Sequence, residues 1–176
     1  MGTVEGLFVT PESGESMVPR ESVDAIEGGL VGDRYLRGTG YYSPYDVCEV
    51  TLIEAEAIET ISEEFGIDLH DGRHRRNIVT RGHELHELLE TTFRIGTAEL
   101  RGTRPRPPCA HVEDVAEEEG VASALGEGRG GICARVESSG TIAVGDTIEV
   151  LEADPRTVGA AIADRLATDV DETAER

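Results

Sequence analysis

Residues 49–66 read EVTLIEAEAIETISEEFG and set the pattern for the rest of the chain. The first five are mostly apolar or β-branched, which is typical of a short strand. Apolar side chains then recur at helical spacing, at Ala57, Ile58, Ile61 and Phe65. Gly66 supplies a natural helix end. The stretch therefore predicts a strand over residues 49–53, followed by an amphipathic helix that ends at Gly66.

Short segments that suit β-strands lie on both sides of this unit. They are residues 4–9, 18–26, 77–80, 98–102, 132–136, 142–144 and 147–151. A helical turn is expected over 85–89 and a short helix over 112–120, while the glycine-, tyrosine- and charge-rich residues 28–45 predict a long loop. Many short strands with few helices favour an α+β fold, mainly β, with a curved β-barrel-like core and a few peripheral helices.

The length of 176 residues is that of one ordinary domain, and 38% hydrophobic residues suffice to fill one core. The chain has no internal repeat and no linker. We expect a single domain over residues 1–153. Residues 154–176 then form a C-terminal helix and an acidic tail, with Asp154 as N-cap and Pro155 at the first helical position.

The charge balance is unusual, because 36 acidic residues face 16 basic residues, and every basic residue is an arginine. The formal net charge is −20, and an excess of carboxylates keeps a protein surface hydrated in concentrated salt. This charge favours a halophilic origin. The alternative is a generic acidic protein. The same charge argues against nucleic-acid binding, which depends on basic side chains that neutralise phosphates.

The absence of lysine excludes two mechanisms. A pyridoxal phosphate enzyme needs a lysine amine for its Schiff base, and a Walker A loop needs its own lysine, so neither resides in this chain. No apolar run reaches membrane-spanning length, and the first residues lack a signal-peptide pattern. We therefore expect a cytoplasmic protein with no membrane association.

Cys109 is the residue that the local pattern marks for chemistry. It follows two consecutive prolines and precedes a helical pattern, so it is expected at a helix N-terminus, where a thiolate is favoured. Arg104 and Arg106 favour the thiolate further, whereas Glu113 and Asp114 oppose it. The alternative from local chemistry is a small, buried, apolar cysteine.

The other two cysteines, Cys48 and Cys133, lie in strand patterns, and we expect both to be structural. Three cysteines in a chain without a secretion signal fit free thiols better than a disulfide framework.

A cluster of cationic side chains stands out in this acidic chain. Its members are Arg73, Arg75, Arg76, Asn77 and Arg81. Guanidinium groups bind phosphate or carboxylate in a bidentate manner, so the cluster predicts an anion site, with internal salt bridging as the alternative.

Histidines offer weaker patterns that could suit a metal ion. They are the pairs His83 with His86 and His70 with His74, and His111 beside Cys109. The ligand spacing of a zinc finger and the HExxH motif are both missing, so a dedicated zinc site is the less favoured interpretation.

An ordered set of segments resembles the MOSC domain family, and the resemblance extends from residue 4 to residue 151. The segments are GDRY at 32–35, EVTLI at 49–53, RRNIVTRG at 75–82, FRIG at 93–96 with AEL at 98–100, PCAHVE at 108–113, and residues 130–136. Any one segment is weak, but the ordered set is specific.

The resemblance implies a β-rich, curved core and the molybdenum cofactor, molybdopterin, as cofactor. It implies that Cys109 carries sulfur as a persulfide or is a molybdenum ligand, and that Arg73, Arg75, Arg76, Asn77 and Arg81 hold the cofactor phosphate. Some relatives have another cysteine three residues before this one, where the present chain has Arg106. A paired-thiol mechanism is therefore not expected.

The implied activity is sulfur transfer or reduction of N-hydroxylated compounds, since the family includes amidoxime-reducing and hydroxylaminopurine-detoxifying proteins. The alternative is a non-catalytic carrier module that delivers sulfur or metal cofactor to a partner. Sulfur would come from a cysteine desulfurase or another donor, because no covalent pyridoxal phosphate is expected here. A reductase would need an electron-donating redox partner, since the chain has no flavin, haem or iron–sulfur motif.

Overall fold

The structure is a computed structural model that describes residues 2–11, 15–37, 48–70, 72–106, 120–126 and 128–153. The strands are β1 (Thr3–Val9), β2 (Val18–Arg20), β3 (Ser22–Ile26), β4 (Gly29–Leu30), β5 (Val50–Glu54), β6 (Ile78–Arg81), β7 (Thr91–Ile95), β8 (Ala98–Pro105), β9 (Ile132–Ser138), β10 (Gly140–Ala143) and β11 (Ile148–Ala153). The helices are α1 (Arg34–Arg37), α2 (Ala55–Phe65), the 3-10 helix η1 (Leu85–Leu88) and α4 (Val121–Ala124).

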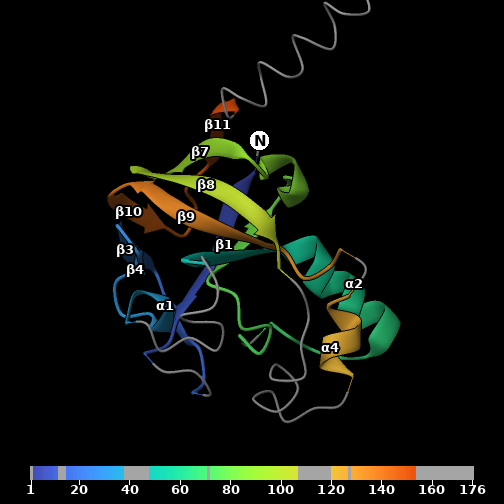
Figure 1. The fold of residues 1–176 in the computed structure, drawn as a ribbon. Helices are drawn as coiled ribbons and strands as arrows, with labels where there is room; N and C mark the ends of the chain where they lie inside the picture. Colours follow the sequence, from blue (N-terminus) through green and yellow to red (C-terminus); the bar gives the residue numbers. More distant parts are fainter. Residues whose placement is uncertain are drawn as a thin grey trace, which may run out of the picture.

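Eight of the strands form one curved sheet in the order β11-β7-β8-β9-β5-β6-β1-β2 (Figure 1). The outer strands β11 and β2 do not pair with each other, so the sheet is not a closed barrel. Its curvature nevertheless brings distant parts together, because Thr3 in β1 forms an isolated bridge with Thr147, just before β11. The mainly β class predicted from the sequence is confirmed, and "barrel-like" describes only the curvature.

A βαβ unit lies in the middle of this sheet. Strand β5 leads directly into α2, and β6 then returns parallel to β5, with Leu52 opposite Ile78. Gly66 ends α2 in the left-handed conformation (φ 68°), and its N–H donates to the carbonyl of Ser62. The strand and helix predicted from residues 49–66 are confirmed, because the apolar spacing sets both elements locally.

Two clusters of buried apolar side chains hold these layers together. One lies inside the curved sheet and includes Leu7, Leu52, Phe93 and Leu100, which are all almost fully buried. The other lies between the sheet and the helices α2 and α4, and it includes Ile61 and residues of both helices. Figure 1 shows α2 and α4 together on one side of the sheet.

The smaller sheet, in the order β10-β3-β4, corrects one prediction. Residues 28–45 were expected to form a loop, but β4 pairs with β3, with Leu30 opposite Ala25. Gly28 and Gly29 have φ values of 101° and 148°, so these glycines allow the tight turn that makes a hairpin. Helix α1 follows. Residues 38–45 lie outside the described part of the chain.

Several other expectations also fall on residues that the structure does not describe. One is the helix predicted over residues 112–120, of which only residue 120 is described. The others are the C-terminal helix and the acidic tail over residues 154–176. Within the described residues, no helix is long and apolar enough to span a membrane.

Candidate functional site

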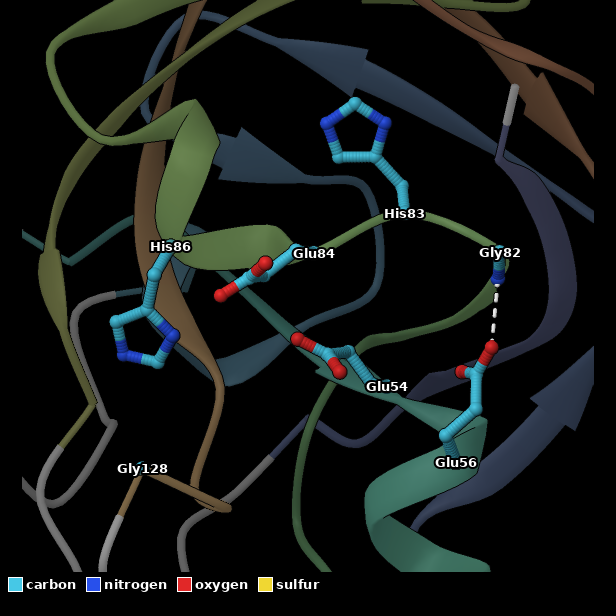
Figure 2. Close-up of a pocket in the computed structure, with 7 residues that line it drawn as sticks. All are labelled: Glu54, Glu56, Gly82, His83, Glu84, His86 and Gly128. Atoms are coloured by element: carbon cyan, nitrogen blue, oxygen red, sulfur yellow. Dashed lines mark hydrogen bonds between the residues drawn. The ribbon is translucent and has the colours of Figure 1, made fainter.

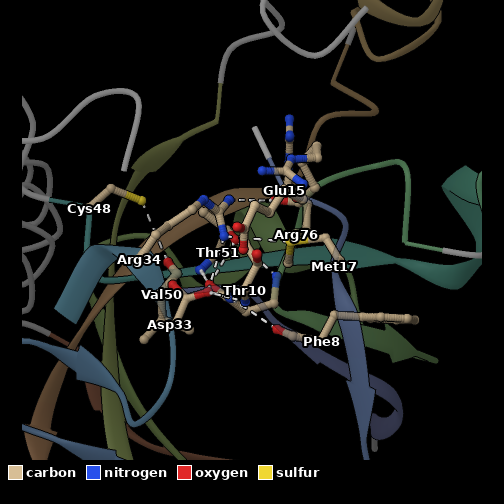
Figure 3. A network of polar contacts seen from close by, with 12 residues as sticks. Phe8, Thr10, Glu15, Met17, Asp33, Arg34, Cys48, Val50, Thr51 and Arg76 are labelled. Carbon is tan, nitrogen blue, oxygen red and sulfur yellow. Dashed lines mark hydrogen bonds and ion pairs between the residues drawn. The ribbon is translucent and has the colours of Figure 1, made fainter. Parts of the chain in front are cut away.

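A buried polar network lies where β1, β5 and the segment before β6 meet (Figure 3). The Asn77 side chain accepts hydrogen bonds from the backbone N–H and the hydroxyl of Thr51, both at 3.0 Å. Its Nδ2 donates to the carbonyl of Phe8 and to Oδ1 of Asp33, both at 3.1 Å. Asp33 also accepts the N–H of Thr10 at 3.2 Å. Asn77 therefore joins three segments of the fold from inside.

Arg34 extends this network toward the loop before β6. Its Nη1 lies 3.1 Å from Asp33 Oδ1, and both side chains are buried. Its Nη2 donates to the carbonyl of Arg75 at 3.0 Å. Arg75 has a φ of 66°, in the left-handed region that non-glycine residues rarely adopt. Arg34 thus supports a strained backbone conformation that sets the direction of the Arg75 side chain.

Arg76 and Arg106 meet on either side of a glycine turn. Arg76 Nε donates to the Gly130 carbonyl at 2.8 Å, and the Arg106 N–H donates to the Gly131 carbonyl at 2.9 Å. A Cβ at Gly130 would lie 2.6 Å from the Arg106 carbonyl oxygen and 3.4 Å from Arg76 Nη2. Only glycine fits between the two arginines without displacing one of them.

These contacts gather four arginines in one part of the interior. Arg34, Arg75, Arg76 and Arg106 are exposed by 3%, 4%, 0% and 7%, and they are the buried arginines among the described residues. Asp33, which pairs with Arg34, is the buried carboxylate among the described residues. Such a concentration of guanidinium groups favours an anionic ligand. We call these four residues the arginine cluster.

The structure separates the cationic residues that are neighbours in sequence. Arg75 and Arg76 belong to the arginine cluster, whereas Arg73 is half-buried and donates to the Asp68 carbonyl. Asn77 is occupied by the internal network. Arg81 lies at the end of β6 and forms ion pairs with Glu5 and Glu59. Their hydrogen bonds raise the pKa of Arg81 and lower that of Glu59.

The sequence had not assigned Arg34 and Arg106 to the anion site. Arg34 occurs in the GDRY segment quoted for the family resemblance, which is the available signal for it, whereas Arg106 lies two positions before the quoted PCAHVE segment. The missing information was burial. Arg34 reaches Arg75 over 41 positions, and Arg106 Nη1 lies 3.9 Å from the Sγ of Cys133 over 27 positions. Neither contact follows from local spacing.

His74 holds Arg76 in place. Its Nδ1 accepts the Arg76 N–H at 2.9 Å, and its carbonyl accepts a hydrogen bond from Arg76 Nη1 at 2.8 Å. The ring packs edge-on against Phe8 at 5.3 Å. Burial, together with the charges of Arg76, His70 and Arg75, lowers the pKa of His74 from 6.5 to about 3. The imidazole is therefore neutral at neutral pH, with its proton on Nε2.

This depressed pKa predicts a loss of stability in acid. Between pH 6.5 and about 3, the unfolded chain binds a proton at His74 that the folded chain does not bind. Stability therefore falls as pH falls through this window, at up to about 1.4 kcal/mol per pH unit. Urea unfolding from about pH 7 to about pH 4 should show a shallower decline for His74→Asn than for the wild type. Equal declines would contradict this role.

The two described cysteines are both buried. Cys48 Sγ lies 3.6 Å from the Val50 carbonyl oxygen, and Cys133 is fully buried beside Arg106. This burial agrees with the structural role expected for both. Cys109 and His111 lie outside the described residues, in the segment 107–119. This segment begins directly after Arg106 of the arginine cluster.

The predicted histidine pairs do not assemble into a metal centre in the described part of the chain. His86 lies within η1, but His83 precedes it, so the two do not share a helical face. Among the described residues, no group of three or more histidine, cysteine or acidic side chains is arranged to hold a metal ion.

Comparison with known proteins now identifies the family. The family model of the MOSC domain matches residues 45–149. No curated protein matches the chain in sequence. The YuaD protein from Bacillus subtilis has a similar structure, with a TM-score of 0.71 and 21% identity, over 86% of this chain and 97% of that one.

Two YiiM structures are also similar. YiiM from Geobacillus stearothermophilus has a TM-score of 0.67 and 17% identity, over 86% of this chain and 76% of its own. YiiM from Escherichia coli has a TM-score of 0.62 and 19% identity, over 85% and 70%. At these identities the neighbours establish the fold, whereas the family model matches more than half of the sequence. The chain therefore belongs to the MOSC domain family.

Proposed function

We propose that this MOSC protein binds the molybdenum cofactor, with its phosphate at the arginine cluster and with Cys109 as molybdenum ligand or sulfur carrier. The observation that carries the proposal is the burial of Arg34, Arg75, Arg76 and Arg106 together, with Arg106 only three positions before Cys109. Family membership supplies the cofactor class.

The residues at this site fit a phosphate-bearing cofactor by their chemistry. Guanidinium groups match phosphate oxygens in geometry and keep their charge at every physiological pH. A thiolate is a soft ligand that suits molybdenum and also accepts sulfane sulfur. When bound, the cofactor would supply a metal that accepts sulfur or exchanges electrons with a substrate.

Within this scheme the chain's own residues have separate tasks. Arg75 and Arg106 would hold the phosphate. Arg34 and His74 would fix Arg75 and Arg76 through the hydrogen bonds already described. For sulfur transfer, the Cys109 thiolate attacks the terminal sulfur of a donor persulfide, forms a Cys109 persulfide and releases the donor thiolate. The donor would be a cysteine desulfurase or a similar protein. Reduction of N-hydroxylated compounds would instead need an electron-donating partner.

The direct test is to measure molybdenum and pterin in protein purified from its native host. Stoichiometric amounts of both are expected. Native protein that holds neither would exclude the cofactor-bound form. A persulfide at Cys109 in such protein, detected by mass spectrometry, would instead support the alternative role as a sulfur carrier.

Arg75→Gly removes one guanidinium group of the arginine cluster. Glycine adopts the φ of 66° without strain, which offsets part of the stability lost with the buried side chain and its hydrogen bond to the Glu15 carbonyl, so we expect a folded variant. We expect the amounts of pterin and molybdenum that the variant retains to fall by about tenfold or more, because a charged hydrogen bond contributes about 1.5–3 kcal/mol to binding. The matched control is Arg81→Gln, which removes the same charge outside the arginine cluster. If both variants retain the cofactor equally, the phosphate does not lie at Arg75.

A further inference from the structure

A small pocket lies between β1, the start of α2 and β6, beside the apolar cluster that the helices cover. Its volume is about 90 Å³. Its lining residues are Glu5, Gly6, Phe8, Ala55, Ile58, His70, His74 and Val79. Most of them are buried, whereas Glu5 and His70 are exposed and mark the mouth. The pocket therefore has mainly apolar walls and a polar mouth.

A larger pocket, of about 580 Å³, lies between the start of α2, the segment before η1 and the turn at Gly128 (Figure 2). None of the residues that line it is buried, so solvent reaches every one of them. The small pocket differs in this respect, because its wall contains a polar side chain, that of His74, with an exposed fraction of 0%.

Gly6 keeps the small pocket open at a bulge in β1. The register between β1 and β6 shifts between Val4 and Gly6, and Val79 is the partner of Gly6. A Cβ at Gly6 would lie 3.3 Å from Cε2 of Phe8 and 3.7 Å from Cβ of Val79. It would therefore take up space between two walls of the pocket. Bulges of this kind often lie next to functional sites.

His74 contributes a hydrogen-bond donor for which the described fold provides no acceptor. Its Nδ1 accepts the Arg76 N–H at 2.9 Å, so the neutral ring carries its proton on Nε2. This Nε2 is buried without a hydrogen-bond partner. The two nitrogens of an imidazole point in divergent directions, so the edge that carries Nε2 is the one left to face the pocket. An acceptor placed there would recover the cost of the unpaired donor.

The polar groups at the mouth already have partners. Glu5 accepts hydrogen bonds from Arg81, and Nδ1 of His70 lies 2.7 Å from Oδ1 of Asp68. Among the described side chains of the pocket, the His74 donor is therefore the group that selects what enters.

This single donor between apolar walls restricts the chemistry of the occupant. A buried water molecule needs two to four polar partners, and the described side chains inside the mouth offer one. A carboxylate would bury its charge against one neutral donor, and an alcohol would leave its own O–H without an acceptor. A carbonyl oxygen needs only the donor, while the carbon atoms beside it pack against the apolar walls.

The volume sets the size of the occupant. An apolar cavity of about 150 Å³ accommodates the six carbon atoms of benzene, so a pocket of about 90 Å³ suits about four non-hydrogen atoms, with one or two more at the mouth. We propose that this pocket binds the carbonyl end of a small neutral molecule, whose oxygen accepts a hydrogen bond from His74 Nε2. The site needs neither Cys109 nor the cofactor, so its failure would leave the proposed function untouched.

NMR titration of the full chain with 2-butanone tests the proposal, with histidine labelled in nitrogen-15. The methyl groups of Ile58 and Val79 should shift in a saturable way, with a dissociation constant on the order of 1 mM. The His74 Nε2 proton should move downfield as its hydrogen bond forms. Two ligands of the same shape serve as probes: 2-methyl-1-butene lacks the oxygen and propionate carries a charge. Both should bind about tenfold more weakly or less.

Filling the pocket should abolish the effect. Ala55→Leu extends a side chain of the wall into the space and should weaken 2-butanone binding by about tenfold or more. Gly6→Ala is a smaller change to the same space and should weaken binding severalfold if the leucine variant does not fold. The matched control is Ala57→Leu, which makes the same change on α2 at a partly buried residue outside the lining and should leave the affinity unchanged.

Three results would overturn the proposal. Absence of saturable binding by the wild type would mean that water serves the His74 donor. Equal binding of 2-butanone and 2-methyl-1-butene, or an unmoved Nε2 proton, would show that the donor makes no contact with the ligand. Equal weakening by Ala57→Leu and Ala55→Leu would place the binding elsewhere.

Discussion

Cys109→Ser is expected to abolish the retention of molybdenum, or the loading of sulfur, while leaving the fold intact. A serine hydroxyl is a hard, neutral oxygen at neutral pH, so it neither binds a soft metal strongly nor carries a persulfide. The expected loss is therefore nearly complete. Molybdenum is measured by elemental analysis of native-host protein, and persulfide by mass spectrometry of the peptide that contains residue 109.

Two controls make this result specific. Cys48→Ser and Cys133→Ser change the same atom at the two described cysteines, which are buried. Both can lower stability, because a hydroxyl is then placed in an apolar setting, but folded protein should still retain molybdenum or sulfur. If Cys109→Ser protein behaves like the wild type in both measurements, Cys109 is not the sulfur ligand and the proposed function is wrong.

Asn77→Ala is expected to produce the largest loss of stability among single substitutions at the site, about 3–5 kcal/mol. The change removes the side-chain oxygen that accepts hydrogen bonds from the backbone N–H and the hydroxyl of Thr51. It also removes the side-chain N–H groups that donate to Asp33 and to the Phe8 carbonyl. All of these groups lie in the interior, where water does not replace the lost bonds. Urea unfolding at neutral pH measures the effect as a shift in midpoint with an unchanged slope.

The comparison variant is Ser62→Ala, which removes a small polar group from the exposed side of α2. Its free energy of unfolding should stay within about 0.5 kcal/mol of the wild type. The sequence assigned Asn77 to phosphate binding, and that role makes a different prediction. A variant of near wild-type stability that fails to retain pterin would favour ligand contact over the structural network.

Much of the fold could be predicted because it depends on local patterns. The apolar spacing in residues 49–66 specifies a strand and a helix wherever the segment lies, and Gly66 ends the helix by a local conformational preference. The hairpin of β3 and β4 was missed, because a glycine-rich stretch is equally compatible with a loop and with a tight turn. Pairing with a partner strand decides between them.

The candidate site is less predictable from the sequence, because cationic residues that are neighbours in the chain point to different places in the fold. Arg75, Arg76 and Arg81 look like one cationic patch in the sequence. In the structure, Arg81 is at the end of β6 beside two surface glutamates, while Arg76 turns inward to the Gly130 carbonyl. The loop before β6 sets these directions, and its shape depends on Arg34 and His74.

The sequence by itself determined the class of fold, the principal helix, the family and the cysteine to test. These depend on residue types in a fixed order, and order is what a sequence carries. The tertiary structure alone decided which arginines form a cluster and which of them lie at the surface. Those groups meet through strand pairing and burial between residues tens of positions apart, which no local periodicity encodes.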